Sequence, residues 1–289
     1  MDFRAIAMGL LFALIWSSAF TSARIIVADA SPLASLSLRF LASGIIGVLI
    51  ARALGQTWNL TPAQWRATFI FGLCQNAIYL GLNFVAMQTV QASLASIIAS
   101  TMPLMVAFAS WIIFREHLSK TGVLGLGLGI AGVVIIMSAR IEAGVDLTGV
   151  ALCIIGAGAL TVATLSMRGA SSGGNLMMVV GLQMLVGSVI LGVASAATET
   201  LRVNVTPELV AAFVYTTLAP GLLATWIWFS LVQRIGAMRA ATFHFLNPFF
   251  GVAAAALILG ERLGWRDAIG VLIIMAGILA VQLSRQTKT

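Results

Sequence analysis

The second half of this chain repeats the first at an offset of 145 residues. The repeat is marked by identical residues at paired positions, and these include prolines, glutamates and glycines. The pairs are Phe84 and Phe229, Gln88 and Gln233, Pro103 and Pro248, Glu116 and Glu261, Leu118 and Leu263, Gly125 and Gly270, and Gly132 and Gly277. We predict one repeat over residues 1–143 and a second over residues 144–289. Self-similarity of this kind indicates a fold built from two copies of one unit.

Long apolar stretches recur through both copies. Apolar residues make up 60% of the sequence and charged residues only 9%, whereas a soluble domain is about 25% charged. A helix that crosses a bilayer needs about 20 mostly apolar residues. Ten stretches between polar breaks meet this requirement: 5–23, 33–51, 67–87, 92–114, 121–139, 147–167, 175–195, 209–233, 240–259 and 267–284. We therefore predict an all-α polytopic membrane protein.

Five predicted spans in each copy determine how the copies are oriented. An odd number of crossings brings the chain out on the opposite side of the membrane, so the second copy is upside down relative to the first. Inverted repeats of this kind are typical of alternating-access transporters, whose substrate site lies near the middle of the bilayer between the repeats. The predicted fold is therefore ten transmembrane helices in two inverted five-helix repeats.

The basic residues between the spans predict which side faces the cytoplasm. With a cytoplasmic N-terminus, the inner loops and ends hold Arg4, Arg52, Arg66, Arg115, Lys120, Arg168, Arg234, Arg239, Arg285 and Lys288. The outer loops hold Arg24, Arg140, Arg202, Arg262 and Arg266. An excess of Lys and Arg on one side is the usual mark of the cytoplasmic face. We expect both termini to be cytoplasmic.

The first apolar stretch also has to be compared with a secretory signal. A signal peptide has a short apolar core and a small-residue cleavage site. Here the stretch is long enough to cross the membrane and carries Trp16 and Phe20 where cleavage would fall. We expect an uncleaved first helix.

Charge and cysteine content exclude several other classes of function. The net charge of +7 comes from basic residues scattered over loops, without the cluster and interleaved aromatic residues that bind a nucleic acid strand. Cys74 and Cys153 both lie inside predicted spans, so neither a disulfide framework nor a metal site is indicated. We expect no metal, no cofactor and no nucleic acid partner.

Short motifs along nearly the whole chain resemble one family of carriers. The first copy contains IWSSAF at 15–20, LRF at 38–40, LNF at 82–84, ASLA at 92–95, MP at 102–103 and REHL at 115–118, and the second contains LNPF at 246–249 and GERL at 260–263. Together these segments resemble the EamA-type family of the drug/metabolite transporter superfamily. Among its members the chain looks most like bacterial amino acid exporters, including exporters of aromatic amino acids.

The resemblance implies a ten-helix, multi-pass carrier of the bacterial inner (cytoplasmic) membrane that exports amino acids and related small metabolites. Its partners would be a small-molecule substrate and membrane lipid, and it would act as a monomer or homodimer. A broader multidrug or metabolite efflux carrier is the alternative within transport.

Polar residues in the third span are candidates for the transport pathway. Polar side chains inside a bilayer are costly and usually face the bundle interior or a watery cavity. Asn76, Tyr79 and Asn83 follow one another at steps of three and four, so a regular helix would place them on one face. Their counterparts in the second copy are Gly221, Ala224 and Trp228. One copy therefore offers hydrogen bonds where the other offers space and an aromatic wall at Trp228.

The ninth span carries a second candidate pair, His244 and Asn247, on a stripe with Ala240 and Gly251. His244 could be a neutral ring hydrogen-bonded between helices. It could equally contact the substrate or carry a proton, since its unperturbed pKa near 6.5 allows both protonation states.

Trp16 and Arg39 are two further candidates with open interpretations. Trp16 lies about 12 residues, or roughly 18 Å, beyond Arg4, which suits either a cavity wall or helix packing better than the membrane interface. Arg39 could snorkel outward or bond a neighbouring helix. It could also bind a substrate carboxylate, because arginine makes bidentate bonds to carboxylates.

Three prolines within spans are candidate hinges. Pro103 and Pro248 each remove a backbone hydrogen bond from the middle of a span, and Pro220 adds a weak point in the eighth span. Matched kinks would allow the fourth and ninth spans to bend, although static kinks supported by neighbouring helices fit the sequence equally well.

The repeated glycines of the fifth and tenth spans suit close helix packing, either within one chain or between two chains.

The placement of acidic residues constrains the mechanism. No Asp or Glu lies in the middle of a predicted span, so the usual carboxylate relay for proton coupling is missing. Uniport down a gradient needs no further residue, whereas proton coupling would have to use His244 or loop acids.

An intramembrane enzyme is the rival class of function. The sequence offers no cluster of metal ligands for metal-dependent catalysis and no pair of embedded acids for an aspartyl mechanism. A serine nucleophile with His244 as its base is the one enzymatic mechanism that the spacing allows. We predict no catalytic residues.

Overall fold

The computed structural model describes residues 3–166 and 174–286. Arg168 and Lys288, which we assign to the cytoplasmic side, lie outside the described residues, and the side chain of Arg285 does too. Within these two ranges the secondary structure is helical, apart from one isolated β-bridge between Ala30 and Val203. The all-α prediction is confirmed.

The described part of the chain contains ten helical spans that are long and apolar enough to cross a membrane, as predicted. The unbroken spans are α1 (Phe3–Asp29), α2 (Pro32–Ala53), α7 (Lys120–Glu142), α8 (Leu147–Ser166), α9 (Leu176–Thr198) and α14 (Trp265–Gln286). The third span comprises α3 (Pro62–Phe71), η1 (Gly72–Leu80) and α4 (Gly81–Ala86), and the fourth α5 (Ala92–Ser100) and α6 (Met102–Ile113). The eighth comprises α10 (Pro207–Leu218), η2 (Ala219–Leu223) and α11 (Ala224–Ile235), and the ninth α12 (Ala237–Ala241), η3 (Thr242–Leu246) and α13 (Asn247–Leu259).

Local sequence signals explain where several helices begin. Thr61 precedes α3, and its hydroxyl accepts a hydrogen bond from the amide of Gln64 while the Gln64 side chain accepts one from the Thr61 amide. This reciprocal capping box satisfies two amides that the helix itself leaves without partners. Pro62 follows at the first helical position, where its missing N–H costs nothing. Thr206 likewise caps α10 through the amide of Leu209 at 3.1 Å.

The chain forms two compact units, and we describe each by itself. Unit 1 comprises residues 1–21, 89–151 and 223–289, and unit 2 comprises residues 22–88 and 152–222. Each unit draws spans from both sequence repeats. The repeat boundary at residues 143 and 144 concerns the sequence and stays a prediction.

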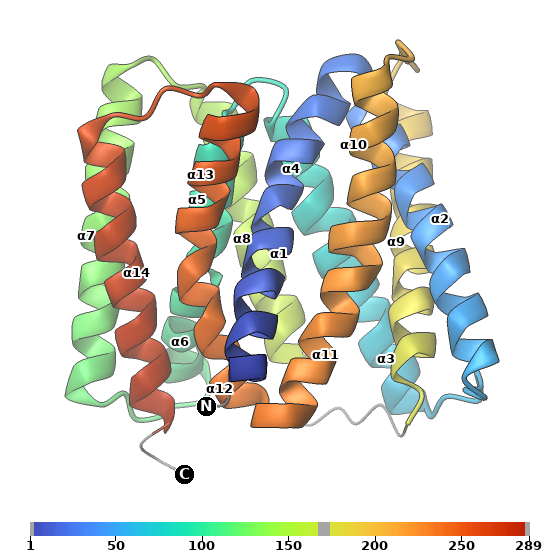
Figure 1. Cartoon of the computed structure of the whole chain (residues 1–289), viewed down its shortest axis with the longest axis horizontal. Helices are drawn as coiled ribbons and strands as arrows, with labels where there is room; N and C mark the ends of the chain where they lie inside the picture. The colour runs from blue at the N-terminus through green and yellow to red at the C-terminus, as the bar shows by residue number, and fades with distance from the viewer. Residues whose placement is uncertain (1–2, 167–173, 287–289) are drawn as a thin grey trace. The chain divides into compact units, whose positions relative to one another are not determined.

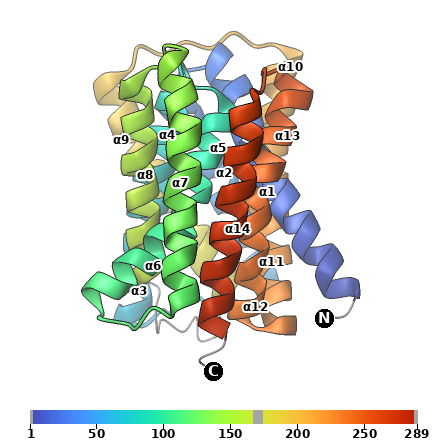
Figure 2. The same cartoon turned by 90° about the vertical axis from the view of Figure 1, so that its left-hand side faces the viewer.

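In unit 1 the fifth span, α7, lies beside the tenth, α14 (Figure 1 and Figure 2). A Cβ atom added to Gly125 would be 2.8 Å from the carbonyl oxygen of Gly277, and one added to Gly132 would be 2.7 Å from that of Gly270. Gly277 is the sequence counterpart of Gly132, and Gly270 is that of Gly125. The earlier glycine of each span therefore contacts the later glycine of the other, so the two spans run antiparallel. The repeated glycines therefore pack against each other within the chain, which the sequence left open.

A second antiparallel pair in unit 1 joins the fourth and ninth spans. Glu261 follows α13, and its carboxylate accepts hydrogen bonds from the amides of Ala92 at 2.7 Å and Ser93 at 3.1 Å, the first residues of α5. A carboxylate at this position satisfies amides that α5 leaves without partners and interacts favourably with the helix dipole. The end of one span therefore caps the start of its counterpart.

Unit 2 repeats this arrangement with the second and seventh spans. The carboxylate of Glu199, just beyond α9, accepts from the amides of Leu33 at 2.8 Å and Ala34 at 3.0 Å in α2. At the other end, the side-chain oxygen of Gln56 accepts from the amide of Met178 at 3.0 Å. Three pairs of equivalent spans thus run antiparallel, as inverted repeats require.

The predicted proline positions coincide with helix irregularities. The fourth span is interrupted at Thr101, two residues before Pro103, and the ninth becomes a 3-10 helix over Thr242–Leu246, directly before Asn247 and Pro248. Pro220 lies in the π-helix η2. These are the distortions expected where proline removes a hydrogen bond, and their role as hinges stays a prediction.

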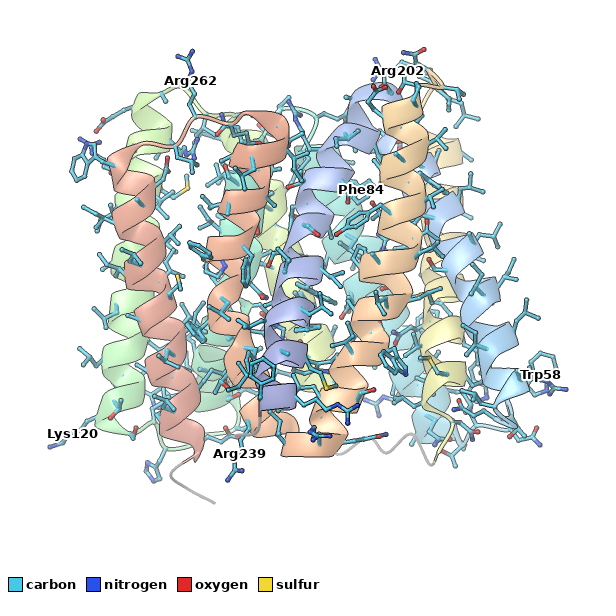
Figure 3. All side chains as sticks on the ribbon, viewed as in Figure 1. Trp58, Phe84, Lys120, Arg202, Arg239 and Arg262 are labelled. Carbon is cyan, nitrogen blue, oxygen red and sulfur yellow. The ribbon has the colours of Figure 1, made fainter. Side chains whose placement is uncertain are left out.

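The labelled side chains show the two ends of each unit. In unit 1, Figure 3 places Lys120 and Arg239 at one end and Arg262 at the other. The start of α1 and the end of α14 lie at the Lys120 end (Figure 1). In unit 2, Trp58 and Arg202 lie at opposite ends. In unit 1, Lys120 and Arg239 thus lie at the end opposite Arg262, as the sequence predicted, and which end faces the cytoplasm stays a prediction.

Candidate functional site

The predicted pathway residues divide between the two units. Unit 1 holds Trp16, Trp228, His244 and Asn247, whereas unit 2 holds Arg39, Asn76, Tyr79 and Asn83. The chemistry differs accordingly. Unit 1 contributes aromatic rings with one amide, and unit 2 contributes a cation with two amides and a phenol.

Four rings of unit 1 form an aromatic cluster made of Phe12, Trp16, Trp228 and His244. The ring centre of Phe12 lies 5.7 Å from that of Trp16, 4.8 Å from that of Trp228 and 5.4 Å from that of His244. The rings of Trp228 and His244 are 5.1 Å apart. These separations are typical of favourable aromatic pairs. Three predicted residues are therefore brought together around a ring that we did not predict.

Phe12 is the member of the aromatic cluster that the sequence prediction missed. Its side chain is only 2% exposed, and it lies four residues before Trp16, so both rings project from one face of α1. That spacing is a detectable signal. It does not distinguish a pathway residue from the many phenylalanines that only fill a membrane helix.

The 3-10 segment sets the geometry of His244 and Asn247. Side chains three residues apart eclipse one another in a 3-10 helix, and here the amide nitrogen of Asn247 is 2.9 Å from Nδ1 of His244. With that amide as donor, Nδ1 is the acceptor and the proton of the neutral ring is on Nε2. Asn247 therefore holds the orientation of the histidine ring.

Besides Asp267 Oδ1 on α14, buried oxygens without hydrogen-bond partners lie on three other helices of unit 1. Asn247 Oδ1 on α13 belongs to a residue predicted from the sequence. The others were not predicted and are the hydroxyl oxygens of Ser17 and Thr21 on α1 and of Ser93 and Ser96 on α5. Buried polar atoms in proteins almost always have a partner, so each exception calls for an explanation.

The amides of unit 2 are already engaged with backbone. Asn76 is 2% exposed and donates to the carbonyl of Gln183 on α9 at 2.9 Å. Asn83 donates to the carbonyl of Tyr79 at 2.8 Å, and its Oδ1 has no partner. Tyr79 itself is buried, at 2% exposed. Asn76 thus joins two helices, whereas Asn83 retains a free acceptor.

The third span departs from the regular helix that its spacing suggested. Asn76 and Tyr79 lie in the nine-residue π-helix Gly72–Leu80, which has i to i+5 hydrogen bonds and is often found at functional sites. No proline occurs in this segment. The wider turn changes the register between Asn76 and Asn83, although both remain buried.

Arg39 belongs to unit 2 and is buried. The residue is 5% exposed, and its guanidinium carbon lies 4.8 Å from the ring centre of Phe40. Its Nη2 faces Gly221, where an added Cβ would be 3.8 Å away. Buried in this way, the side chain does not snorkel along the outside of the unit.

No carboxylate partner of Arg39 occurs among residues 3–166 and 174–286. Ion pairs in these ranges include Arg140 with Asp267 at 3.2 Å and Arg266 with Glu142 at 2.7 Å, neither of which involves Arg39. The Nε atom of Arg39 also lacks a hydrogen-bond partner. Arg39 is thus a buried cation with unused donors. In the same ranges, no three His, Cys, Asp or Glu side chains are grouped to hold a metal ion.

Comparison with known proteins agrees with this architecture. A chain of a solved crystal structure matches over 100% of both chains with a TM-score of 0.71 at 20% identity, which concerns the fold alone. An uncharacterized transporter of Bacillus subtilis, YvbV, is 26% identical and covers 93% of this chain and 88% of its own. A probable amino-acid metabolite efflux pump of Salmonella typhimurium is 24% identical and covers 94% of this chain and 92% of its own.

The model of the EamA-like transporter family matches the chain twice, over residues 3–138 and 147–283. The two matches together span almost the whole sequence and follow the repeat found at the outset. The resemblance inferred from the short motifs is therefore confirmed, and this chain belongs to the EamA-like transporter family.

Proposed function

We propose that this protein exports amino acids and related small metabolites across the bacterial inner membrane by alternating access. The observation that carries the proposal is the buried, unpaired guanidinium of Arg39. A buried charge without a partner costs several kcal/mol. A substrate carboxylate would remove much of that cost, because two parallel N–H donors of arginine fit its two oxygens.

The aromatic cluster of unit 1 supports the same substrate class. An amino acid with an apolar side chain needs an apolar wall, and Trp16, Trp228 and Phe12 present large apolar faces. Within unit 2, Asn83, whose Oδ1 has no partner, and Tyr79 offer polar groups of their own. One relative is itself named a probable amino-acid metabolite efflux pump, which favours amino acids over a general drug substrate.

The transport step that we propose uses the irregular spans. The breaks before Pro103 and Pro248 fall in equivalent spans of inverted repeats, and the π-helix at Pro220 adds a third flexible point. Bending at these positions would expose the substrate alternately to either side. We place both termini in the cytoplasm because most basic loop residues then face inward.

We further propose uniport down the concentration gradient, with no chemical step. The middle of the spans offers no carboxylate to relay protons, and the relatives named above are transporters. Proton coupling through His244 is the alternative. Liposomes with an imposed proton gradient would separate the two, since His244→Gln would remove the gradient dependence only in the coupled case.

Counterflow into proteoliposomes tests the function directly. Vesicles containing the full chain would be preloaded with phenylalanine, leucine or alanine, and uptake of the labelled amino acid would be compared with that of a cationic dye. We expect the amino acids to exchange and their carboxamide analogues to be poor substrates. Exchange of dyes without amino acids would overturn the proposal and favour a broad efflux carrier. Hydrolysis of a substrate during the assay would indicate an enzyme.

A further inference from the structure

Unit 1 contains a set of buried oxygens with no role in the proposed binding of a carboxylate. Ser17 is 0%, Ser96 1% and Asn247 5% exposed, yet the two hydroxyl oxygens and Asn247 Oδ1 have no hydrogen-bond partner. We call these three residues the oxygen cluster. A buried polar group left without a partner costs about 1–3 kcal/mol. The oxygen cluster therefore destabilises the fold unless a ligand or water donates hydrogen bonds to it.

Two of the three residues, Ser17 and Ser96, meet at Gly251. A Cβ atom added to Gly251 would lie 1.8 Å from Oγ of Ser96 and 3.8 Å from Cβ of Ser17. The two serines, from α5 and α1, therefore face the same point on α13. Asn247 lies one turn earlier on α13, roughly 6 Å along the helix axis and on the same face as Gly251. Only glycine at position 251 allows the hydroxyl of Ser96 to come this close.

Other buried hydroxyls in this protein provide an internal comparison. Ser18 donates to the carbonyl of Ile15 at 2.8 Å, and Ser100 donates to the carbonyl of Ser96 at 2.7 Å. Bonding to a carbonyl of the preceding turn is the usual way for a serine to satisfy itself within a helix. Ser17 and Ser96, on the same two helices, do not do so.

The cluster has the chemistry of a receptor for hydrogen-bond donors. The amide nitrogen of Asn247 already has a partner in His244, so the unpartnered atom of this side chain is its carbonyl oxygen, which is an acceptor. The two hydroxyls can accept as well. An ammonium group has three donors and no acceptor, and N–H···O distances near 2.9 Å place its three acceptors roughly 5 Å apart.

We propose that Ser17, Ser96 and Asn247 bind the ammonium group of the exported substrate. The proposal rests on the proposed function, since it assumes an amino acid as cargo, and it is argued from residues of unit 1 alone. It narrows the substrate class to compounds with a free primary amine. The adjoining aromatic cluster, linked through His244, would then receive the substrate side chain.

Competition in proteoliposomes tests the ammonium site. Counterflow of labelled phenylalanine would be measured against unlabelled phenylalanine, N-acetylphenylalanine and 3-phenylpropionate, for the parent and for Ser17→Ala/Ser96→Ala. We expect the two analogues without a free ammonium to compete at least about 10-fold more weakly in the parent, as loss of hydrogen bonds to a charged group requires. In the double variant phenylalanine itself should compete more weakly. Its advantage over the two analogues without an ammonium group should therefore shrink. Ser100→Ala is the matched control, because its hydroxyl is already satisfied within α5.

The outcomes separate this inference from the function it rests on. If the parent moves no amino acid, the proposed function fails. If it moves amino acids but the double variant keeps the parent's selectivity for the amine, only the ammonium site fails. A sodium requirement that the double variant loses while it keeps amine selectivity would assign the oxygens to a metal cation and overturn the proposal. Ser17→Ala alone provides a milder test if the double variant does not fold.

Discussion

Glu261 caps the first amides of α5 in unit 1, and Glu199 does the same for α2 in unit 2. The scaffolds of the two units are therefore joined by the same chemistry at the helix ends. Their interiors differ. The interior of unit 1 holds an aromatic cluster beside unpartnered oxygens, whereas that of unit 2 holds an unpaired arginine and buried amides. The two units thus share the chemistry of their helix ends but differ in the residues buried in the middle of their spans.

The largest expected effect is loss of Arg39 from unit 2. Arg39→Met should lower exchange of amino acids by roughly 10- to 100-fold, the value of a charge-assisted bidentate contact. Folded stability should stay the same or rise, because an unpaired buried charge is replaced by an apolar side chain. Counterflow and thermal unfolding in detergent would check both. A large loss of stability would instead assign Arg39 to helix packing.

The next prediction concerns the glycine contact of unit 1. Gly125→Ala would put a Cβ atom 2.8 Å from the carbonyl of Gly277, so we expect it to lower the free energy of unfolding by about 1–3 kcal/mol. Gly127→Ala is the control. Apart from its chain neighbours and the backbone of its own helix, no atom of the described residues lies within 4 Å of a Cβ at that position, and alanine favours helix over glycine by about 1 kcal/mol. Equal unfolding temperatures for the two variants would contradict the packing of α7 on α14.

The glutamate caps allow a direct comparison of the units. Glu199→Ala and Glu261→Ala each leave two helix amides without their acceptor, so each should cost about 1–2 kcal/mol. Similar losses would support a shared scaffold. If denaturant unfolding shows one variant near the parent and the other strongly destabilised, the units do not depend equally on their caps.

The smallest effect lies in the connection before the sixth span. The hydroxyl of Thr89 donates to the Asp146 carboxylate at 2.6 Å, and this bond lowers the pKa of Asp146 below its ordinary value of 3.8. The stabilisation is present above pH 3.8 and is lost as the pH falls through the lower, folded-state pKa. Thr89→Ala should raise that pKa toward 3.8, which NMR titration of carboxyl-labelled Asp would detect. An unchanged pKa would show that the backbone amides of Thr148 and Gly149 suffice.

Much of the fold was accessible from the sequence. Ten spans follow from the length and spacing of apolar stretches, and Pro103 and Pro248 mark where the helices become irregular. The π-helix over Gly72–Leu80 could not be predicted, because no proline in that segment marks it. The predicted residues Trp16, Trp228 and His244 do meet, but Phe12 and the serines were missed since their types are common in membrane helices.

The sequence alone determined the membrane class, the repeat, the family and the positions where helices break, because hydrophobic length and proline chemistry act locally. Only the tertiary structure decided which spans pair, that Gly125 contacts Gly277 while its sequence counterpart is Gly270, and that Glu261 caps α5. It also decided which polar groups are left without partners. Hydrogen-bond satisfaction depends on atoms brought together from distant parts of the chain, which no local pattern records.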